Sequence, residues 1–200
     1  MESGGNTYIS LKYTAGDYNG LALSISSSNE NWSKAIKIYS DRIDERYILP
    51  LNNIINQAQE NGCEEQNAFV IAAIECLLIE TMMQFFNGWE KTKGNNTEVY
   101  KDFLSNEFNG IFDEYSGKIF YEKIRCGILH QAQTKGHCKL TVDTAVAIEK
   151  RDKNIIAVNP YLLFESIRKW NEEYKCKLMD DKQEKLRENF IKKMNSICKE

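Results

Sequence analysis

Hydrophobic positions that recur every three or four residues predict helices over most of the chain. The first long stretch covers residues 30–61, and Pro50 predicts that this helix kinks or splits near Leu49. A second helix is predicted over residues 64–86. Because it is apolar nearly all round, we expect a central helix packed on several sides.

The second half of the chain continues this pattern. A helix is predicted to start near residue 116 or 117 and to end by residue 136. Asn159-Pro160 predicts the start of another helix, with proline at its first position, that ends near residue 177. A charged helix over residues 180–198 is expected to end the chain.

Two segments have the composition of strands. Residues 7–26 hold two β-rich runs separated by turn-forming residues, which predicts a hairpin. Residues 139–150 and 154–158 are rich in β-branched residues and flank a short polar turn, which predicts a second one. The expected organisation is therefore an N-terminal extension with a hairpin (1–29), a helical domain with a hairpin near 139–158 (30–178), and a C-terminal charged helix (179–200).

Composition narrows the protein class. With 42% hydrophobic and 28% charged residues, the chain matches an ordinary soluble globular protein. A net charge of −3 argues against a non-specific nucleic-acid coat protein but leaves room for a local basic groove. The six cysteines form no CxxC pair, and no secretory signal is visible, so we expect reduced thiols in the cytoplasm. Charged residues interrupt the apolar run 68–86, which favours a buried helix over a membrane span.

The candidate chemistry centres on Arg125 and His130. Arginine carries a permanent charge on a fork that fits phosphate, and histidine titrates near neutral pH. In a straight helix these positions are about 140° apart, so the two side chains would flank a groove. Glu122, Cys126 and His130 would form a stripe beside Arg125. The alternative is an ion-paired arginine and a histidine that caps the helix C-terminus.

Glu75 and Glu80 lie in the apolar helix over residues 64–86 and need a partner if they are buried. We expect one of them to form a buried ion pair that orients Arg125; direct chemistry and surface exposure are the alternatives. His130, His137 and Cys138 lack a fourth ligand at a zinc spacing, so no metal or other cofactor is predicted.

Segments 73–81, 125–132 and 158–164 together resemble the HEPN superfamily, and more narrowly the stand-alone prokaryotic HEPN proteins of defence and toxin systems. Arg125 and His130, separated by four residues, match the family signature of an arginine followed by a histidine. The resemblance covers about residues 30–175. It implies a mainly α-helical HEPN-like bundle, here with small β-hairpin insertions, that assembles as a two-fold dimer with the motif helices facing each other.

The resemblance further implies a metal-independent endoribonuclease whose RNA substrate supplies the 2′-OH nucleophile, leaving a 2′,3′-cyclic phosphate. Arg125 and His130 would be catalytic. The supporting residues would be Glu75, Glu80, Glu122, Cys126 and Gln131, and the candidates for contact with the RNA backbone are Lys123 and Lys135. An antitoxin or defence-system protein is a possible partner. The alternative is a non-catalytic HEPN-fold subunit that binds RNA or protein. Cys126, where the family commonly has a polar residue, and the acidic pI favour that alternative.

Overall fold

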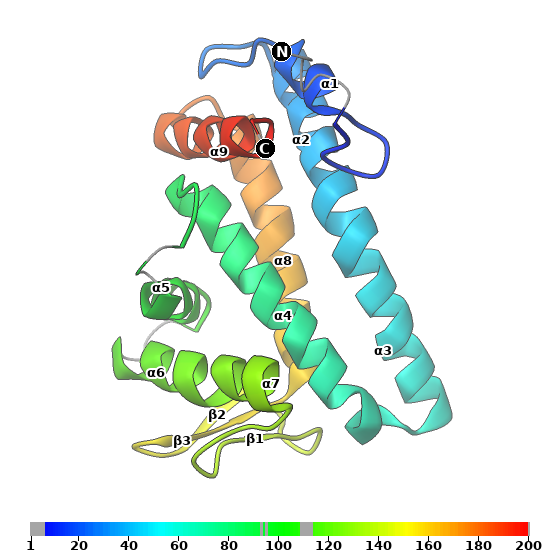
Figure 1. The fold of residues 1–200 in the computed structure, drawn as a ribbon, viewed down its shortest axis with the longest axis vertical. Coiled ribbons are helices and arrows are strands. Elements are labelled where there is room, and N and C mark those ends of the chain that lie inside the picture. Colours follow the sequence, from blue (N-terminus) through cyan, green and yellow to red (C-terminus); the bar gives the residue numbers. More distant parts are fainter. Residues whose placement is uncertain (1–6, 93, 95, 109–113, 200) are drawn as a thin grey trace. The chain divides into compact units, whose positions relative to one another are not determined.

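Helices form most of the chain, and the strands form one small sheet (Figure 1). The computed structural model describes residues 7–92, 94, 96–108 and 114–199. Its α-helices and π-helices (η) are α1 (Ala15–Asn19), α2 (Asn29–Ile43), η2 (Asp44–Ile48), α3 (Leu49–Asn61), α4 (Glu64–Asn87), α5 (Asn96–Glu107), α6 (Glu114–Ile119), η3 (Phe120–Arg125), α7 (Cys126–Gln131), α8 (Pro160–Met179) and α9 (Glu184–Ile197). The predicted mainly α-helical class is confirmed, as are the helices that end near residues 86 and 177.

Where the sequence predicts a kink or split near Leu49, the structure has a π-helix within a continuous helical segment. Between α2 and α3, the N–H of Leu49 donates to the carbonyl of Asp44, one residue farther away than in an α-helix. Proline has no N–H, and its ring clashes with the carbonyl four residues earlier. An extra residue in the preceding turn relieves both constraints, so the helix continues past Pro50 without ending.

The predicted hairpin over residues 7–26 is wrong. Only a single bridge joins Tyr8 to Thr14, and the expected turn is the helix α1. Thr14 starts this helix with a capping box: its hydroxyl accepts from the N–H of Asp17 at 3.2 Å, and its own N–H donates to the Asp17 carboxylate at 2.7 Å. This pairing satisfies backbone groups at the helix start, so the local helix replaces strand pairing.

The second hairpin is confirmed in residues 148–158. Strands β2 (Ile148–Asp152) and β3 (Ile155–Val158) pair antiparallel. The first predicted strand, over residues 139–150, is instead divided: its start is the short strand β1 (Lys139–Leu140), and its end is the beginning of β2. Strand β1 lies parallel to β3, on the side opposite β2. The sheet order is therefore β1-β3-β2, with the buried strand β3 in the centre.

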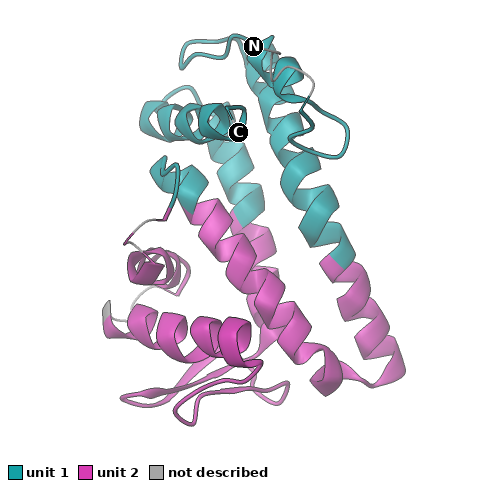
Figure 2. Cartoon of the chain, in the orientation of Figure 1, with its two compact units in different colours: residues 1–50, 84–91, 171–200 teal, residues 51–83, 92–170 magenta. Residues whose placement is uncertain are grey.

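The chain forms two compact units (Figure 2). Unit 1 contains residues 1–50, 84–91 and 171–200. Its core is aromatic: the ring of Tyr39 lies 4.9 Å from that of Phe85 and 5.9 Å from that of Phe190. The Tyr39 hydroxyl donates to the buried amide oxygen of Asn171 at 2.9 Å. The terminal helix α9 therefore packs within this unit through Phe190.

Unit 2 contains residues 51–83 and 92–170, and with them all the predicted site residues. Its core joins α4, α5 and the α6–η3–α7 helix, where Tyr100 stacks on Phe120 at 5.1 Å and Phe103 packs near Trp170 at 6.4 Å. Gly117 makes this packing possible, because a β-carbon there would overlap the backbone of Lys101. The candidate site is therefore built on helices that share one core.

Helix α4 meets the length and composition of a membrane-spanning helix, and half of its apolar stretch is buried. Core helices of soluble proteins meet the same test, so one such helix is weak evidence for a span.

Candidate functional site

The helix that carries Arg125 and His130 is not the single α-helix over 116–136 that the sequence predicts. It contains the π-helix η3, and the N–H of Cys126 donates to the carbonyl of Tyr121. Arg125 is the last residue of η3, and His130 lies in the last turn of α7. Single π turns inside α-helices occur frequently at functional sites. The predicted stripe of Glu122, Cys126 and His130 is therefore interrupted, because its first member lies in the π segment.

This helix ends at Gln131, within the predicted limit of residue 136. Ala132 adopts the left-handed conformation (φ 52°), and its N–H donates to Ile128 at 3.0 Å. The chain then turns back over Gly127, where a β-carbon would overlap the carbonyl oxygen of Gln133. Glycine at position 127 therefore allows the chain's own return loop to pack against the helix.

Arg125 forms an ion pair with Glu80 of α4. Its Nε donates to one carboxylate oxygen at 2.7 Å, and its Nη2 lies 3.5 Å from the other. The hydroxyl of Tyr100 donates to the same carboxylate at 2.8 Å. The Arg125 side chain remains 20% exposed and that of Glu80 16% exposed. Glu80, and not Glu75, is therefore the carboxylate that orients Arg125.

The surroundings keep Arg125 charged. Burial lowers its pKa, but the bonds and the charge of Glu80 outweigh this effect, so the pKa rises above its ordinary value. The guanidinium also lies 5.7 Å from the ring centre of Tyr121, whose hydroxyl accepts from the Asn96 amide at 3.2 Å. Neither of the two tyrosines beside Arg125 is among the residues predicted from the sequence. Tyr121 could have been found from its position one helical turn earlier, whereas nothing in the sequence pointed to Tyr100.

Glu75 is fully buried and has no hydrogen-bond partner for either carboxylate oxygen in the described part of the chain. Burial raises the pKa of its carboxyl well above the ordinary value. The expectation that a buried Glu75 would be paired with a cation is therefore wrong. A carboxylate in this apolar surrounding would lose its hydration without compensation, so burial favours the neutral form of the acid.

His130 and Gln131 are exposed at the end of α7. Next to them, Leu129 keeps 47% of its surface exposed. Among the described residues, no hydrogen bond joins the His130 ring to Arg125. The structure thus places the two predicted catalytic residues on one helix but in different surroundings. Arg125 is anchored against α4, and His130 faces outward.

The remaining predicted residues separate into two groups. Cys126 is half-buried and lies close to the Tyr121 hydroxyl and to Arg125. Glu122 instead pairs with Lys118 at 3.8 Å. Lys123 and Lys135 are joined through their backbones, since the N–H of Lys135 donates to the Lys123 carbonyl at 2.9 Å. Only Glu80 and Cys126 are therefore in the immediate surroundings of Arg125.

In the described part of the chain, histidine, cysteine, aspartate and glutamate side chains form no cluster of three or more that could hold a metal ion. Comparison of the sequence with models of protein families and with curated proteins, and of the structure with solved structures, finds no match.

Proposed function

We propose that this protein is a metal-independent endoribonuclease of the HEPN type, with Arg125 and His130 as its catalytic residues. RNA carries the nucleophile, the 2′-OH next to the scissile phosphate. His130 would accept the proton of this hydroxyl, and Arg125 would stabilise the charge that develops on the phosphorus-bound oxygens. A second histidine would protonate the leaving 5′-oxygen. The products are then a 2′,3′-cyclic phosphate and a 5′-OH.

The fixed position and permanent charge of the Arg125 guanidinium are the main support for this proposal. Glu80 and Tyr100 hold the guanidinium in place, and its pKa is raised, so the charge is permanent and oriented. The bonds to Glu80 use Nε and Nη2 and leave Nη1 outside the ion pair. The side chain is also 20% exposed. A cation that is prepositioned and still accessible stabilises a phosphoryl transition state with little reorganisation.

A homodimer is part of the same proposal, because one chain leaves His130 without a neighbouring catalytic group. The outer side of α4 supports a second copy: Phe69, Val70 and Leu77 recur at helical spacing and are 39%, 45% and 40% exposed. Leu129, next to His130, is exposed as well. A partner helix that covers these apolar residues would bring a second His130 to the site. Contiguous exposed apolar surface commonly marks a protein interface.

The second candidate is a non-catalytic HEPN-type subunit that binds RNA or protein. It is favoured by the same ion pair, since Glu80 neutralises part of the Arg125 charge and no hydrogen bond joins Arg125 to His130 in the described residues. In this case the exposed apolar residues of α4 would face a partner protein.

The chain contains two histidines, which allows a matched test. Purified protein is incubated with mixed RNA in EDTA, beside His130→Asn and His137→Asn variants. Asparagine tolerates the positive φ of 64° at position 137. Cleavage by the parent and by the His137 variant, but not by the His130 variant, supports the nuclease. RNA binding without cleavage in all three proteins supports the second candidate.

A role in antiphage defence or as a toxin, an antitoxin or defence-system partner, and a cytoplasmic location follow from the same proposal. A toxic RNase should arrest growth when it is expressed in bacteria, and the His130→Asn protein should not. Equal growth of both cultures at equal expression would argue against the toxin role.

A further inference from the structure

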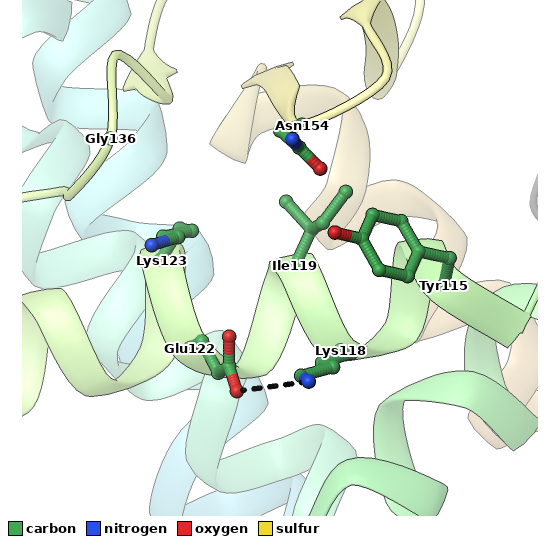
Figure 3. Close-up of a pocket in the computed structure, with 7 residues that line it drawn as sticks. All are labelled: Tyr115, Lys118, Ile119, Glu122, Lys123, Gly136 and Asn154. Atoms are coloured by element: carbon green, nitrogen blue, oxygen red, sulfur yellow. Dashed lines mark ion pairs between the residues drawn. The ribbon is translucent and has the colours of Figure 1, made fainter.

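A small polar pocket lies on unit 2, between the α6–η3 helix, the loop that follows α7 and the turn between β2 and β3 (Figure 3). Its volume is about 250 Å³, and it is lined by Tyr115, Lys118, Ile119, Glu122, Lys123, Gly136 and Asn154. Asn154 faces Ile119 and the Tyr115 hydroxyl across the pocket, and Lys123 lies at one end. Segments far apart in the sequence therefore bring an ammonium, an amide and a hydroxyl to one cavity.

Lys123 is the distinctive member of this pocket. Its ammonium has no ion pair or hydrogen bond with any residue that the structure describes. The Lys123 side chain packs against Gly136, whose backbone has a positive φ of 59°. A β-carbon at that position would lie 3.3 Å from the Lys123 side chain, tighter than ordinary contact. The return loop thus supports a lysine whose charge is unused within the protein.

The net positive charge of the pocket lining favours an anionic ligand. Two lysines and one glutamate give the lining a net positive charge, and the glutamate is only loosely held by Lys118, at 3.8 Å. A cation would meet this positive charge, and a neutral ligand would leave the ammonium of Lys123 unpaired. An anion would pair with Lys123 and could also take Lys118 from Glu122. The Tyr115 hydroxyl and the Asn154 amide add neutral donors of the kind that bind phosphate oxygens.

The size of the pocket limits the ligand to a small group. Drug-sized ligands occupy sites of about 300–1,000 Å³. At about 250 Å³ the cavity is smaller than this range. It is large enough for a phosphate with its bound waters and too small for a whole oligonucleotide. Lys123, which lines the pocket, belongs to the same π-helix as Arg125 and precedes it by two residues.

We propose that this pocket binds a phosphate group of the RNA strand and so fixes the strand along the helix that carries Arg125. The inference deepens the proposed nuclease function and rests on it. Lys123 is a substrate-binding residue here, and Gly136 positions it. The strand would extend beyond the reacting phosphate over the α6–η3 helix, which makes binding dependent on ionic strength.

Binding of a single-stranded RNA oligonucleotide to the His130→Asn protein in EDTA, measured over a range of salt concentrations, tests the pocket without cleavage. Each lost phosphate contact reduces the slope of log affinity against log salt by about 0.7. Lys123→Gln is expected to produce this reduction. Lys37→Gln, an exposed lysine of α2, is the matched control and should leave the slope unchanged. An unchanged slope for both variants would overturn the proposal.

Asn154→Asp is a second variant. It leaves the α6–η3 helix unchanged and places a carboxylate in the pocket. It should weaken RNA binding at low salt, while the circular dichroism spectrum stays that of the parent. A third arm uses AMP as a free phosphate monoester. If Lys123→Gln abolishes AMP binding but leaves the RNA slope intact, the pocket serves a free nucleotide, and its assignment to the strand is wrong.

The two proposals fail in different ways. If the parent protein cleaves no RNA but Lys123→Gln lowers the salt slope, the phosphate pocket stands and the catalytic role of His130 falls. If the parent cleaves RNA and the slope is insensitive to Lys123, the nuclease stands and the pocket falls.

Discussion

Replacing Glu75 with glutamine should change how the free energy of unfolding depends on pH. Glu75 is fully buried, neither carboxylate oxygen has a hydrogen-bond partner among the described residues, and burial raises the pKa well above the ordinary value of 4.5. In the unfolded chain the same carboxyl is in water and ionises near that ordinary value. The folded protein therefore keeps a proton that the unfolded chain releases.

The sign and size of the effect follow from this difference in bound protons. Below pH 4.5 both states hold the proton, and the contribution of Glu75 to stability is fully present. Above that pH only the folded state holds it, so stability falls by about 1.4 kcal/mol for each pH unit until the folded carboxyl ionises. Two pH units correspond to about 2.7 kcal/mol. Glutamine resembles the neutral acid in shape and does not ionise, so this loss disappears.

Urea unfolding at pH 4.5, 5.5, 6.5 and 7.5, at one protein concentration, measures the effect. The difference in stability between Glu75→Gln and the parent should grow in favour of the variant as the pH rises. Glu60→Gln, an exposed glutamate of α3, is the control and should follow the parent at every pH. Parallel curves for the parent and Glu75→Gln would refute the reasoning, because they would mean that Glu75 ionises equally in both states.

Further predictions concern the anchor of Arg125 and the turn after α7. Glu80→Gln should lower the free energy of unfolding by about 2 kcal/mol in urea unfolding and slow RNA cleavage, because it removes a charged partner. Tyr100→Phe should cost only about 1 kcal/mol in the same assay. Gly127→Ala should destabilise by about 1–3 kcal/mol, since its β-carbon would overlap the return loop. Ala132→Gly should stabilise by roughly 0.5–1 kcal/mol by relieving the left-handed backbone, and no change in melting temperature would contradict this.

Local sequence signals explain which helices could be predicted. Pro50 indicated the break between α2 and α3, and Asn159-Pro160 indicated the start of α8. The β-rich composition of residues 7–26 predicts a hairpin, but the local pairing of Thr14 with Asp17 starts a helix there instead. These two residues form a capping box, a helix signal that the sequence already contained.

The pairing of Arg125 depends on tertiary placement and was not predictable to the residue. Glu75 and Glu80 are five positions apart in α4, so they point about 140° away from each other. Only one can face η3, and the periodicity of a helix that is apolar all round does not indicate which. The structure resolves this through the contact of Glu80 with Arg125 and Tyr100. The fate of Glu75, a buried acid without a partner, runs against the general rule that such groups are paired.

No sequence signal indicated the π-helix η3 either. This segment determines where the side chains of Arg125 and His130 lie in a single chain. Because η3 ends at Arg125, the arginine meets Glu80, while the α-helical turn that follows carries His130 to the surface. A proton-transfer group that faces outward acts only on a molecule that covers it. In the proposed nuclease, RNA and a second copy of α7 would supply that cover. A variant that keeps the fold but prevents dimer formation, such as Leu77→Lys on the exposed side of α4, should therefore lose cleavage while keeping the parent's circular dichroism spectrum. Light scattering reports the dimer, and a cleaving monomer would exclude a shared site.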